Sequence, residues 1–384
     1  MRTDRGFCLL ALVGGAVRDT LLTRWHGGQP AAHDRDWLVV GTSPQAMVDA
    51  GFAPVGRDFP VFLHPQSHEE FALARTERKV AAGYRGFTFH AAPEVTLAQD
   101  LARRDLTINA LAVPLPRAYG LHPPADWVWQ EDEVVDLHGG LQDLRQGVLR
   151  HVTEAFGEDP VRLLRLARFA ARWPQFTVAP ATTDWLQAMV QRGEVQALVA
   201  ERVWAELAGA LQAQAPERAL QVLHACGALA QWLPGVLPPS AGLERAVQRG
   251  HALAVRWACL CQPLSAEALQ RVQHSLRVPR PCADLATLLH AQGSALAAWA
   301  TLTPEALASH VQACDPWRRP ERFAQLLQAV ACSHHATEAD VYALTQAAQV
   351  MAKVPAESLA KAGGNVAQRI AQARLEALRR WRQA

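Results

Sequence analysis

The stretch Leu12-Val-Gly14-Gly15-Ala-Val-Arg18-Asp19 has the pattern of a β-strand, a two-glycine turn and the start of a helix. Because glycine has no side chain, the backbone N–H groups of such a turn can approach a phosphate closely. The start of the helix adds a partial positive charge, and Arg18 supplies a forked guanidinium one turn further on. The pattern predicts a phosphate-binding turn, with an ordinary glycine turn as the structural alternative.

A second stretch, Asp34-Arg-Asp36-Trp-Leu-Val-Val40, ends in the apolar run of a buried strand. Successive side chains of a strand point to opposite faces, so Asp34 and Asp36 share a face that Arg35 does not. Two carboxylates this close repel each other unless a divalent cation lies between them. An isolated Asp-x-Asp is often mere surface charge. Combined with the glycine turn, it predicts metal-dependent transfer of a nucleotidyl group.

The charge balance limits how the chain can bind nucleic acid. Its 384 residues contain 38 Lys and Arg against 36 Asp and Glu, a formal net charge of +2. Binding by bulk charge alone is therefore excluded, and any anion site must be local. Lys79, Lys353 and Lys361 are the lysines of the sequence, and none follows a glycine, which excludes a P-loop nucleotide site.

The cysteines favour a reducing compartment. Their number, seven, is odd and no Cys-x-x-Cys occurs, so neither a disulfide framework nor a zinc ribbon is indicated. We therefore expect a cytoplasmic protein. Residues 1–13 imitate a secretory signal, but the glycine turn directly after them has a more specific meaning. No apolar run approaches the roughly 20 residues that span a membrane.

Secondary-structure signals divide the chain into a mixed α/β head and an all-helical remainder. Strands are expected at 7–13, 37–40, 61–64, 70–74, 127–129 and 134–136, and a capped helix at 44–49. Helical spacing dominates from about residue 151, and a Pro/Gly-rich linker lies at 233–242. The predicted fold class is α+β, with a head at 1–144, a helical neck at 145–232 and a helical body and tail at 243–384. The last helix is expected at about 367–382.

Five ordered motifs carry a resemblance to a known family. They are Gly14-Gly15-x-x-Arg18-Asp19, Asp34-x-Asp36, Arg103-Arg104-Asp105-Leu-Thr-Ile-Asn109-Ala110, Asp136-x-x-Gly139-Gly140-x-x-Asp143, and Glu158-Asp159-Pro-Val-Arg162-x-x-Arg165-x-x-Arg168-Phe169. In this order they resemble the bacterial class II CCA-adding tRNA nucleotidyltransferases over about residues 9–210. The connecting stretch 55–65 is similar to that of the enterobacterial-type members.

The resemblance implies a nucleotidyltransferase-type mixed sheet head and a magnesium-dependent reaction. Its implied partners are tRNA, CTP and ATP, without DNA or a membrane. Asp34 and Asp36 would be the catalytic carboxylates that hold two Mg²⁺ ions. Glu70, on a neighbouring strand, is either a third metal ligand or a solvated edge residue.

The same resemblance implies which residues bind the nucleotide. Gly15 and Arg18 would bind the triphosphate, Arg104 the sugar-phosphate part, and Asn109 would support the sugar region. The expected reaction is in-line attack of the RNA 3′-hydroxyl on the α-phosphorus, with pyrophosphate as the leaving group.

The helix after Gly157 is expected to carry base recognition. At about 100° per residue, one face carries Arg162, Arg165, Arg168 and Arg172, and an ordinary helix would expose it to solvent. The resemblance implies instead that Arg162, Arg165 and Arg168 bind ATP or CTP, with Asp159 and Arg162 reading the base edge. Asp159 followed by proline also has the pattern of a helix N-cap.

Three further stretches have mainly structural interpretations. Residues 75–87 are polar with glycine hinges, and the resemblance implies a flexible loop that helps to switch from CTP to ATP. Residues 136–143 combine a tight glycine turn with a carboxylate that can accept from backbone N–H groups. The charges at 201–206 begin a neck helix.

Longer enterobacterial-type relatives continue with an HD-type phosphohydrolase domain, which needs His and Asp metal ligands. The corresponding stretch here, Ala258-Cys-Leu-Cys-Gln-Pro-Leu264, has none. A soft-metal site could be imagined among Cys259, Cys261, His290, His334 and His335, but their spacing matches no known pattern. We therefore expect the C-terminal half to be a non-catalytic body that contacts tRNA.

The sequence predicts template-independent addition and repair of the tRNA 3′-terminal CCA. A poly(A) polymerase shares the head motifs and is the first alternative, although the short, weakly basic C-terminus argues against it. A CC-only or A-only enzyme is a second. An inert tRNA-binding protein is a remote third, because the motif residues Arg18, Asp34, Asp36 and Arg104 are all present.

Overall fold

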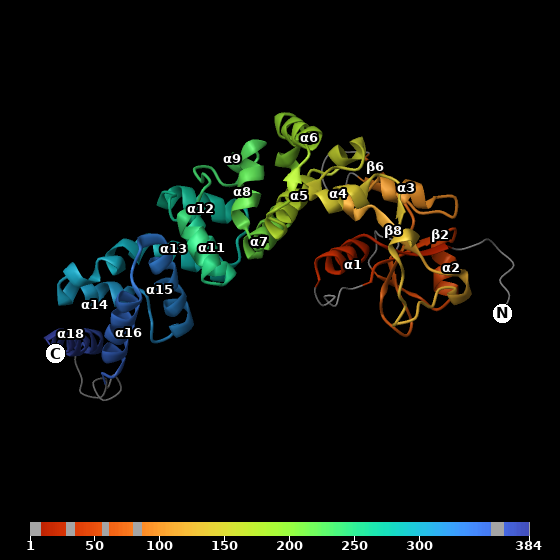
Figure 1. The fold of residues 1–384 in the computed structure, drawn as a ribbon. Coiled ribbons are helices and arrows are strands. Elements are labelled where there is room, and N and C mark those ends of the chain that lie inside the picture. Colours follow the sequence, from red (N-terminus) through yellow and green to blue (C-terminus); the bar gives the residue numbers. More distant parts are fainter. Residues whose placement is uncertain (1–8, 28–34, 56–60, 80–86, 355–364, 384) are drawn as a thin grey trace. The chain divides into compact units, whose positions relative to one another are not determined.

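The structure, a computed structural model, describes residues 9–27, 35–55, 61–79, 87–354 and 365–383. The chain forms two compact units, 1–199 and 200–384, shown from red to blue in Figure 1. The first contains the sheet and the second is helical throughout its described residues. The predicted α+β class is confirmed. The division into head, neck and body stays a prediction, because compact units do not delimit functional parts.

A seven-stranded mixed sheet forms the centre of unit 1, in the order β3-β4-β5-β2-β1-β8-β9. Its strands are β1 (Leu9–Val13), β2 (Trp37–Val40), β3 (Ala53–Val55), β4 (Val61–Leu63), β5 (Glu70–Leu73), β8 (Leu111–Pro114) and β9 (Val135–Asp136). Strands β2 and β5 run parallel, and the other neighbours are antiparallel. Strands β1 and β2 are buried apolar runs and lie where the sequence predicts them, whereas the equally buried β8 was not predicted.

The other elements of unit 1 surround this sheet. The helices are α1 (Gly15–His26), α2 (Pro44–Asp49), α3 (Leu97–Ala102), α4 (Gly140–Gln146), α5 (Val161–Arg172) and α6 (Pro180–Gln191). Short 3₁₀ turns are η2 (Thr107–Asn109), η3 (Arg117–Tyr119), η4 (Glu131–Glu133), η5 (Glu154–Glu158) and η6 (Glu194–Ala197). Two small ribbons pair β6 (Thr76–Lys79) with β7 (Phe87–His90), and β10 (Val148–Leu149) with β11 (Thr177–Val178).

The core beneath the site is made of small residues. Ala11, Ala110 and Ala112 from β1, η2's end and β8 pack with Leu38 of β2 and Leu101 of α3 in one buried cluster. Alanines on the sheet let α3 approach closely, and α1 packs against β1 and β8. The sheet therefore holds the start of α1 near the segment that follows α3.

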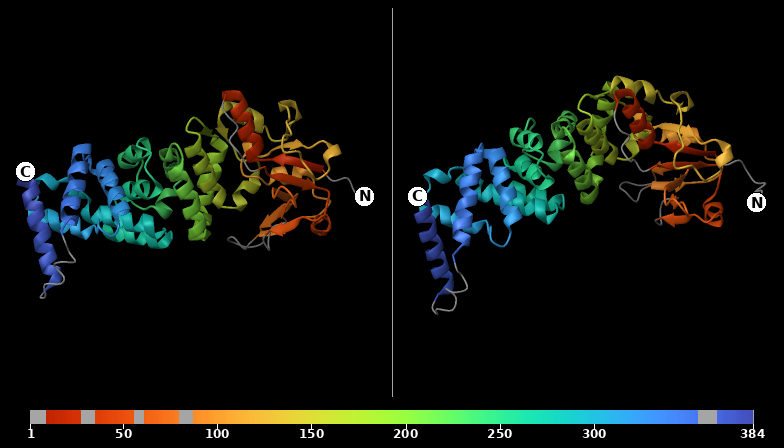
Figure 2. Two further views of the ribbon diagram at one scale, coloured as in Figure 1. Left: turned by 90° about the horizontal axis from the view of Figure 1, so that it is seen from below. Right: turned by 60° about the horizontal axis from the view of Figure 1, so that its bottom comes forward.

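Unit 2 consists of packed helices, seen from green to blue in Figure 2. They are α7 (Ala200–Gln212), α8 (Pro216–Ala225), α9 (Leu229–Trp232), α10 (Ala241–Gln248), α11 (Leu253–Cys261), α12 (Ala266–Ser275), α13 (Arg280–Ala297), η7 (Trp299–Thr301), α14 (Pro304–Ala313), α15 (Pro320–His334), α16 (Glu338–Ala352) and α18 (Val366–Gln383). The predicted linker separates α9 from α10, and the last helix matches its predicted range. In the part of the chain that is described, no helix has the length and apolar character needed to cross a bilayer.

Two local predictions are wrong. Residues 127–129 form no strand; Trp129 is buried and Trp127 packs against Trp37 with ring centroids 5.7 Å apart, so the aromatic run reflects core packing. Residues 75–87 are not simply a loop, because β6 and β7 form a ribbon at its two ends. The segment between these strands, 80–86, lies outside the described residues.

Candidate active site

The glycine turn at the end of β1 is shaped for close backbone approach. Gly14 has a φ of 69°, a conformation that favours glycine. A Cβ atom at Gly14 would lie 2.9 Å from Nη1 of Arg104. Gly15 begins α1, as predicted. The turn therefore needs glycine both for its backbone conformation and for the arginine beside it.

Arg18 and Arg104 both contact Asn109, next to the turn. Nη1 of Arg18 donates to the side-chain oxygen of Asn109, and Nη1 of Arg104 donates to its carbonyl oxygen at 3.4 Å. Arg18 is only 4% exposed, and Asn109 is also buried. The structure thus brings together three of the residues predicted to bind the nucleotide, from α1, η2 and the segment after α3.

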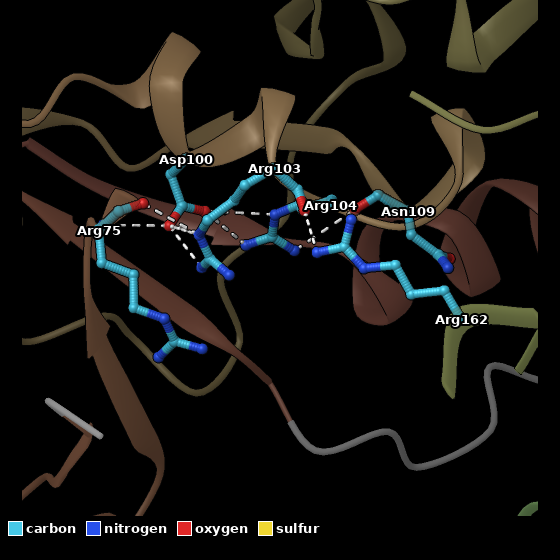
Figure 3. Close-up of polar contacts among 6 residues, drawn as sticks. All are labelled: Arg75, Asp100, Arg103, Arg104, Asn109 and Arg162. Atoms are coloured by element: carbon cyan, nitrogen blue, oxygen red, sulfur yellow. Dashed lines mark hydrogen bonds and ion pairs between the residues drawn. The ribbon is translucent and has the colours of Figure 1, made fainter. Parts of the chain in front are cut away.

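Asp100 holds Arg103 and Arg104 in place, and the sequence analysis did not predict this role. Its carboxylate accepts from Nη2 of Arg103 at 2.6 Å, Nη2 of Arg104 at 3.1 Å and the backbone N–H of Arg75 at 3.3 Å (Figure 3). Burial raises the pKa of Asp100, but the charges of Arg104 and Arg103 outweigh it and lower the pKa overall. The i, i+3, i+4 spacing from Asp100 on α3 to Arg103 and Arg104 just after it was the available signal.

Asp105 is a second buried carboxylate whose role the motif did not reveal. It accepts from Nδ2 of Asn109 at 2.9 Å and from Nε of Arg165 at 2.8 Å. Burial raises its pKa, yet the charge of Arg165 and the hydrogen bond from Asn109 lower it to about 2. Asn109 is thereby fixed between Asp105 and Arg18, and Arg165 of α5 joins the same network.

The carboxylates predicted to bind metal lie at the edge of β2. Asp34 is outside the described residues. Asp36 is exposed just before β2, and its carbonyl accepts from the N–H of Val13 at 3.0 Å, beside the glycine turn. Trp37 of β2 pairs with Phe71 of the parallel strand β5. One residue earlier on both strands, the same register places the exposed Glu70 next to Asp36. Carboxylates are the ligands that Mg²⁺ prefers, so the donors present fit a divalent cation.

A larger metal cluster is not formed by the described residues, since no group of three or more His, Cys, Asp or Glu side chains comes together there. This includes the cysteines and histidines of unit 2.

The start of α5 places the two predicted base readers together. The N–H of Val161 donates to Oδ1 of Asp159 at 3.1 Å. The helix begins at Val161 with Pro160 as its N-cap, so Asp159 lies one residue before the cap position predicted for it. Arg162 is 7% exposed and donates to the carbonyl of Ala155 at 2.8 Å. It also donates to the carbonyl of Arg103 at 2.6 Å (Figure 3). The interpretation of Arg162 as part of a solvated basic face is therefore wrong.

The remaining predicted arginines of α5 lie along the same helix. Arg165 is tied to Asp105, as described above. Arg168 lies with its guanidinium carbon 5.0 Å from the ring centre of Phe169. Both are partly exposed, so they can contact a ligand that enters from solvent.

The turn at 136–143 is structural, as predicted. The carboxylate of Asp136 accepts from the N–H groups of His138, Gly140 and Leu141, at 3.1, 2.9 and 2.9 Å. A Cβ atom at Gly140 would lie 2.2 Å from the carbonyl oxygen of Thr107, so glycine is required there. The turn thereby packs directly against η2, which carries Asn109.

The stretch that corresponds to the HD motif lies at the end of α11. Cys259 and Cys261 are both buried, and burial raises the pKa of the Cys261 thiol. A cavity of about 140 Å³ beside it is lined by Cys259, Gln262 and Ser333, among others. These are not the ligands of a hydrolytic metal centre.

Comparison with known proteins identifies the class first. The family described as "Poly A polymerase head domain" matches residues 10–150, and that described as "Probable RNA and SrmB- binding site of polymerase A" matches residues 175–238. The fold resembles "The complex structure of CCA-adding enzyme with ATP", with a TM-score of 0.68 at 20% identity over 97% of this chain and 86% of that chain. Fold and site together define a nucleotidyltransferase.

Full-length relatives then identify the family. The chain is 47% identical to the "CCA-adding enzyme" of Bordetella pertussis over 375 residues, which cover 96% of this chain and 95% of the relative. It is 44% identical to the "Multifunctional CCA protein" of Polaromonas naphthalenivorans over 422 residues, covering 96% and 97%. The chain belongs to the family of CCA-adding enzymes, which are tRNA nucleotidyltransferases. Enzymes of this family generally depend on a divalent metal ion.

Proposed function

We propose that this chain acts in the cytoplasm to add and repair the 3′-terminal CCA of tRNA, using CTP and ATP and releasing pyrophosphate. The observation that carries the proposal is the meeting of Arg18, Arg104 and Asn109 at the glycine turn, beside the strand edge of Asp36. A bound triphosphate needs several fixed cationic donors, and the carboxylates that hold the catalytic metal must lie next to them.

Asp34 and Asp36 would hold two Mg²⁺ ions, with Glu70 as a possible further ligand. When bound, the metal supplies a lowered pKa at the attacking 3′-hydroxyl and neutralises phosphate charge. The exposure of Asp36 and Glu70 supports this assignment, because a site that takes its substrate from solvent must be open.

The chain's own residues position the nucleotide. Gly15 and Arg18 would contact the triphosphate, Arg104 the sugar-phosphate part, and Asn109 the sugar region. Arg18 and Arg104 are already oriented by carboxylates, so little rearrangement is needed when the nucleotide arrives. Arg165 and Arg168 would add positive charge along the same face.

Asp159 and Arg162 would select the base. Asp159 can accept from the exocyclic amine of cytosine or adenine, and Arg162 can donate to cytosine N3 or adenine N1. Uracil and guanine present an oxygen and an N–H at these positions, which would leave polar groups unpaired. The carbonyls of Ala155 and Arg103 fix the guanidinium plane of Arg162 before the base arrives.

Unit 2 would bind tRNA without catalysing a reaction. Its last helix, α18, carries Arg369, Arg374, Arg379, Arg380 and Arg382, which can contact phosphates.

The test is a tRNA transcript that lacks its last three residues, incubated with Mg²⁺ and each nucleotide alone or together. CTP alone should add two residues, and CTP with ATP should give a product three residues longer that stops. UTP and GTP should be poor substrates. Long tails from ATP alone would favour a poly(A) polymerase, and a stop after two C would favour a CC-only enzyme. A single A added only to a tRNA that already ends in CC would favour an A-only enzyme, and tRNA binding without extension an inert protein.

A further inference from the structure

One helix, α5, contacts the candidate site at both of its ends. Asp159 and Arg162 lie at its start, where they would read the base. Arg172 and Trp173 lie at its end. Twelve residues at about 1.5 Å each give a rod of about 18 Å, long enough to reach from the base to the triphosphate of one nucleotide.

Two aromatic rings at the end of α5 pack against the guanidinium of Arg18. Phe169 and Trp173 are stacked, with ring centres 5.4 Å apart and an interplanar angle of 3°. The guanidinium carbon of Arg18 lies 4.7 Å from the ring centre of Trp173 and 5.3 Å from that of Phe169. All three side chains are buried, so the attraction between cation and ring is not weakened by water.

A shared carboxylate ties Arg18 to the same end of α5. Asp19 accepts from Nε of Arg18 at 2.8 Å and Nη2 of Arg18 at 3.0 Å. It also accepts from Nη2 of Arg172 at 3.0 Å. Burial lowers the pKa of Arg18, and the hydrogen bond and charge of Asp19 oppose that change. Asp19 and Asn109 together fix the guanidinium in its plane, while Trp173 fixes it from the face.

We propose that Trp173, Arg172 and Asp19 are positioning residues, which hold the guanidinium of Arg18 where the triphosphate binds. None of the three is among the residues predicted to bind the nucleotide, although Asp19 belongs to the first motif, and none need touch the nucleotide. The inference rests on the proposed role of Arg18. It gives α5 a second task, because the helix that would read the base also sets the cation for the phosphates.

The head contains a matched control for this contact. Arg24, on the same helix as Arg18, lies with its guanidinium carbon 4.3 Å from the ring centre of the buried Trp129. It is an arginine–tryptophan contact in the same unit, with an exposed arginine where Arg18 is buried, and neither residue belongs to the candidate site. Trp129→Leu therefore reports the general cost of losing an arginine–tryptophan pair.

The experiment compares Trp173→Leu, Trp129→Leu, Arg18→Ala and the double variant Arg18→Ala/Trp173→Leu in the full-length chain. Inhibition of CTP incorporation by tripolyphosphate reports the phosphate subsite, and inhibition by cytidine reports the base subsite. We expect Trp173→Leu to weaken tripolyphosphate inhibition about 10-fold, the scale of a desolvated cation–π contact. The KM for CTP should rise by a similar factor. Cytidine inhibition and tRNA affinity should not change, and Trp129→Leu should match the wild type.

The double variant tests whether Trp173 acts through Arg18. If it does, Trp173→Leu has no further effect once Arg18 is alanine, whereas independent effects would multiply. Normal tripolyphosphate inhibition in Trp173→Leu, or equal loss for cytidine, would overturn the inference. Normal inhibition in Arg18→Ala would instead overturn the proposed triphosphate role of Arg18.

Arg172→Gln provides a second route if Trp173→Leu does not fold. The Arg172 side chain is 42% exposed, so its replacement leaves the core intact. We expect tripolyphosphate inhibition to weaken about 3-fold, because one charge-assisted hydrogen bond to Asp19 is lost. An unchanged inhibition constant would contradict the role of Asp19 as a shared anchor.

Discussion

The two units differ in where they bury polar side chains. Among the described residues, the ten polar or charged side chains that are buried all belong to unit 1, from Arg18 to Thr182. Unit 2 has none in its described part. Its core is mainly leucine, alanine and valine, with buried thiols at Cys226, Cys259, Cys261, Cys282, Cys314 and Cys332. Both units are compact, so compactness alone does not require buried charge.

The difference agrees with the proposal that nucleotide transfer takes place in unit 1. Removing a charge from water costs several kcal/mol, and an apolar side chain of similar size usually packs as well. Buried charges therefore persist mainly where their position matters more than their cost. Four of the ten, Asp19, Arg18, Asn109 and Asp105, form one chain of contacts that continues to the partly exposed Arg165. Every member is paired, and the chain passes beside the glycine turn.

The largest effect is expected from Asp36→Ala. Nucleotide transfer should fall by more than about 100-fold, because a direct metal ligand matters more than the outer contacts that cost up to that factor. Binding of tRNA should be unchanged, since this carboxylate is assigned to the reacting phosphates. Single-turnover incorporation of CTP measures the first quantity and filter binding the second. Asp49→Ala, an exposed carboxylate of the same unit, is the control, and near-normal turnover in Asp36→Ala would remove the metal assignment.

A smaller and more selective effect is expected from Asp159→Ala and Arg162→Ala. The ratio of CTP to UTP incorporation should fall about 10- to 100-fold, the value of a hydrogen bond to a charged group. Incorporation of each of the four nucleotides should be measured separately, with the exposed Arg192→Ala as control. Equal proportional losses for all four would reduce Asp159 to a helix-start residue and Arg162 to a clamp on the carbonyls of Ala155 and Arg103.

Much of this site could be predicted from local sequence. The glycine turn, the strand of Trp37–Val40 and the arginines of α5 follow from spacing within short segments. The carboxylates that hold the arginines could not be predicted in this way. Asp105 meets Arg165 sixty residues later in the chain, and Asp19 meets Arg172 across 153 residues. Such pairs depend on how helices pack against the sheet, which periodicity within one segment cannot specify.

Asp100 lies between these cases. Its partners Arg103 and Arg104 are three and four positions further along the chain, directly after α3, so these pairs could be predicted from the sequence. That the carboxylate is completely buried was not, because burial depends on the sheet beneath α3. The strand predicted at 127–129 failed for the same reason, since an apolar aromatic run is equally suited to irregular chain packed on a core.

The buried network should make unit 1 sensitive to acid. The pKa of Asp105 is about 2 in the folded chain against an ordinary 3.8, so its ionised form stabilises the fold. This contribution, about 2 kcal/mol, is present above pH 3.8 and is lost as the pH falls towards 2. Urea unfolding should show Asp105→Asn less stable by about this amount at pH 7, with the difference shrinking towards pH 2. The exposed Asp184→Asn should show no such difference, and a constant gap across this range would mean that packing, not charge, is lost.

The last prediction is that unit 2 has no phosphohydrolase activity, and it tests the comparison of the two units most directly. If unit 2 buries no charge because it performs no chemistry, the purified chain should not hydrolyse 2′,3′-cyclic nucleotides or p-nitrophenyl phosphate with added Ni²⁺, Mn²⁺ or Mg²⁺. Nucleotide incorporation in the same preparation shows that the chain is folded and active. Hydrolysis needs a metal held by imidazole or carboxylate and an activated water, and the stretch Ala258–Leu264 offers thiols and an amide in a small cavity. Metal-dependent hydrolysis that survives Asp36→Ala would place a second active site outside unit 1's network, and buried charge would no longer separate the catalytic unit from the other.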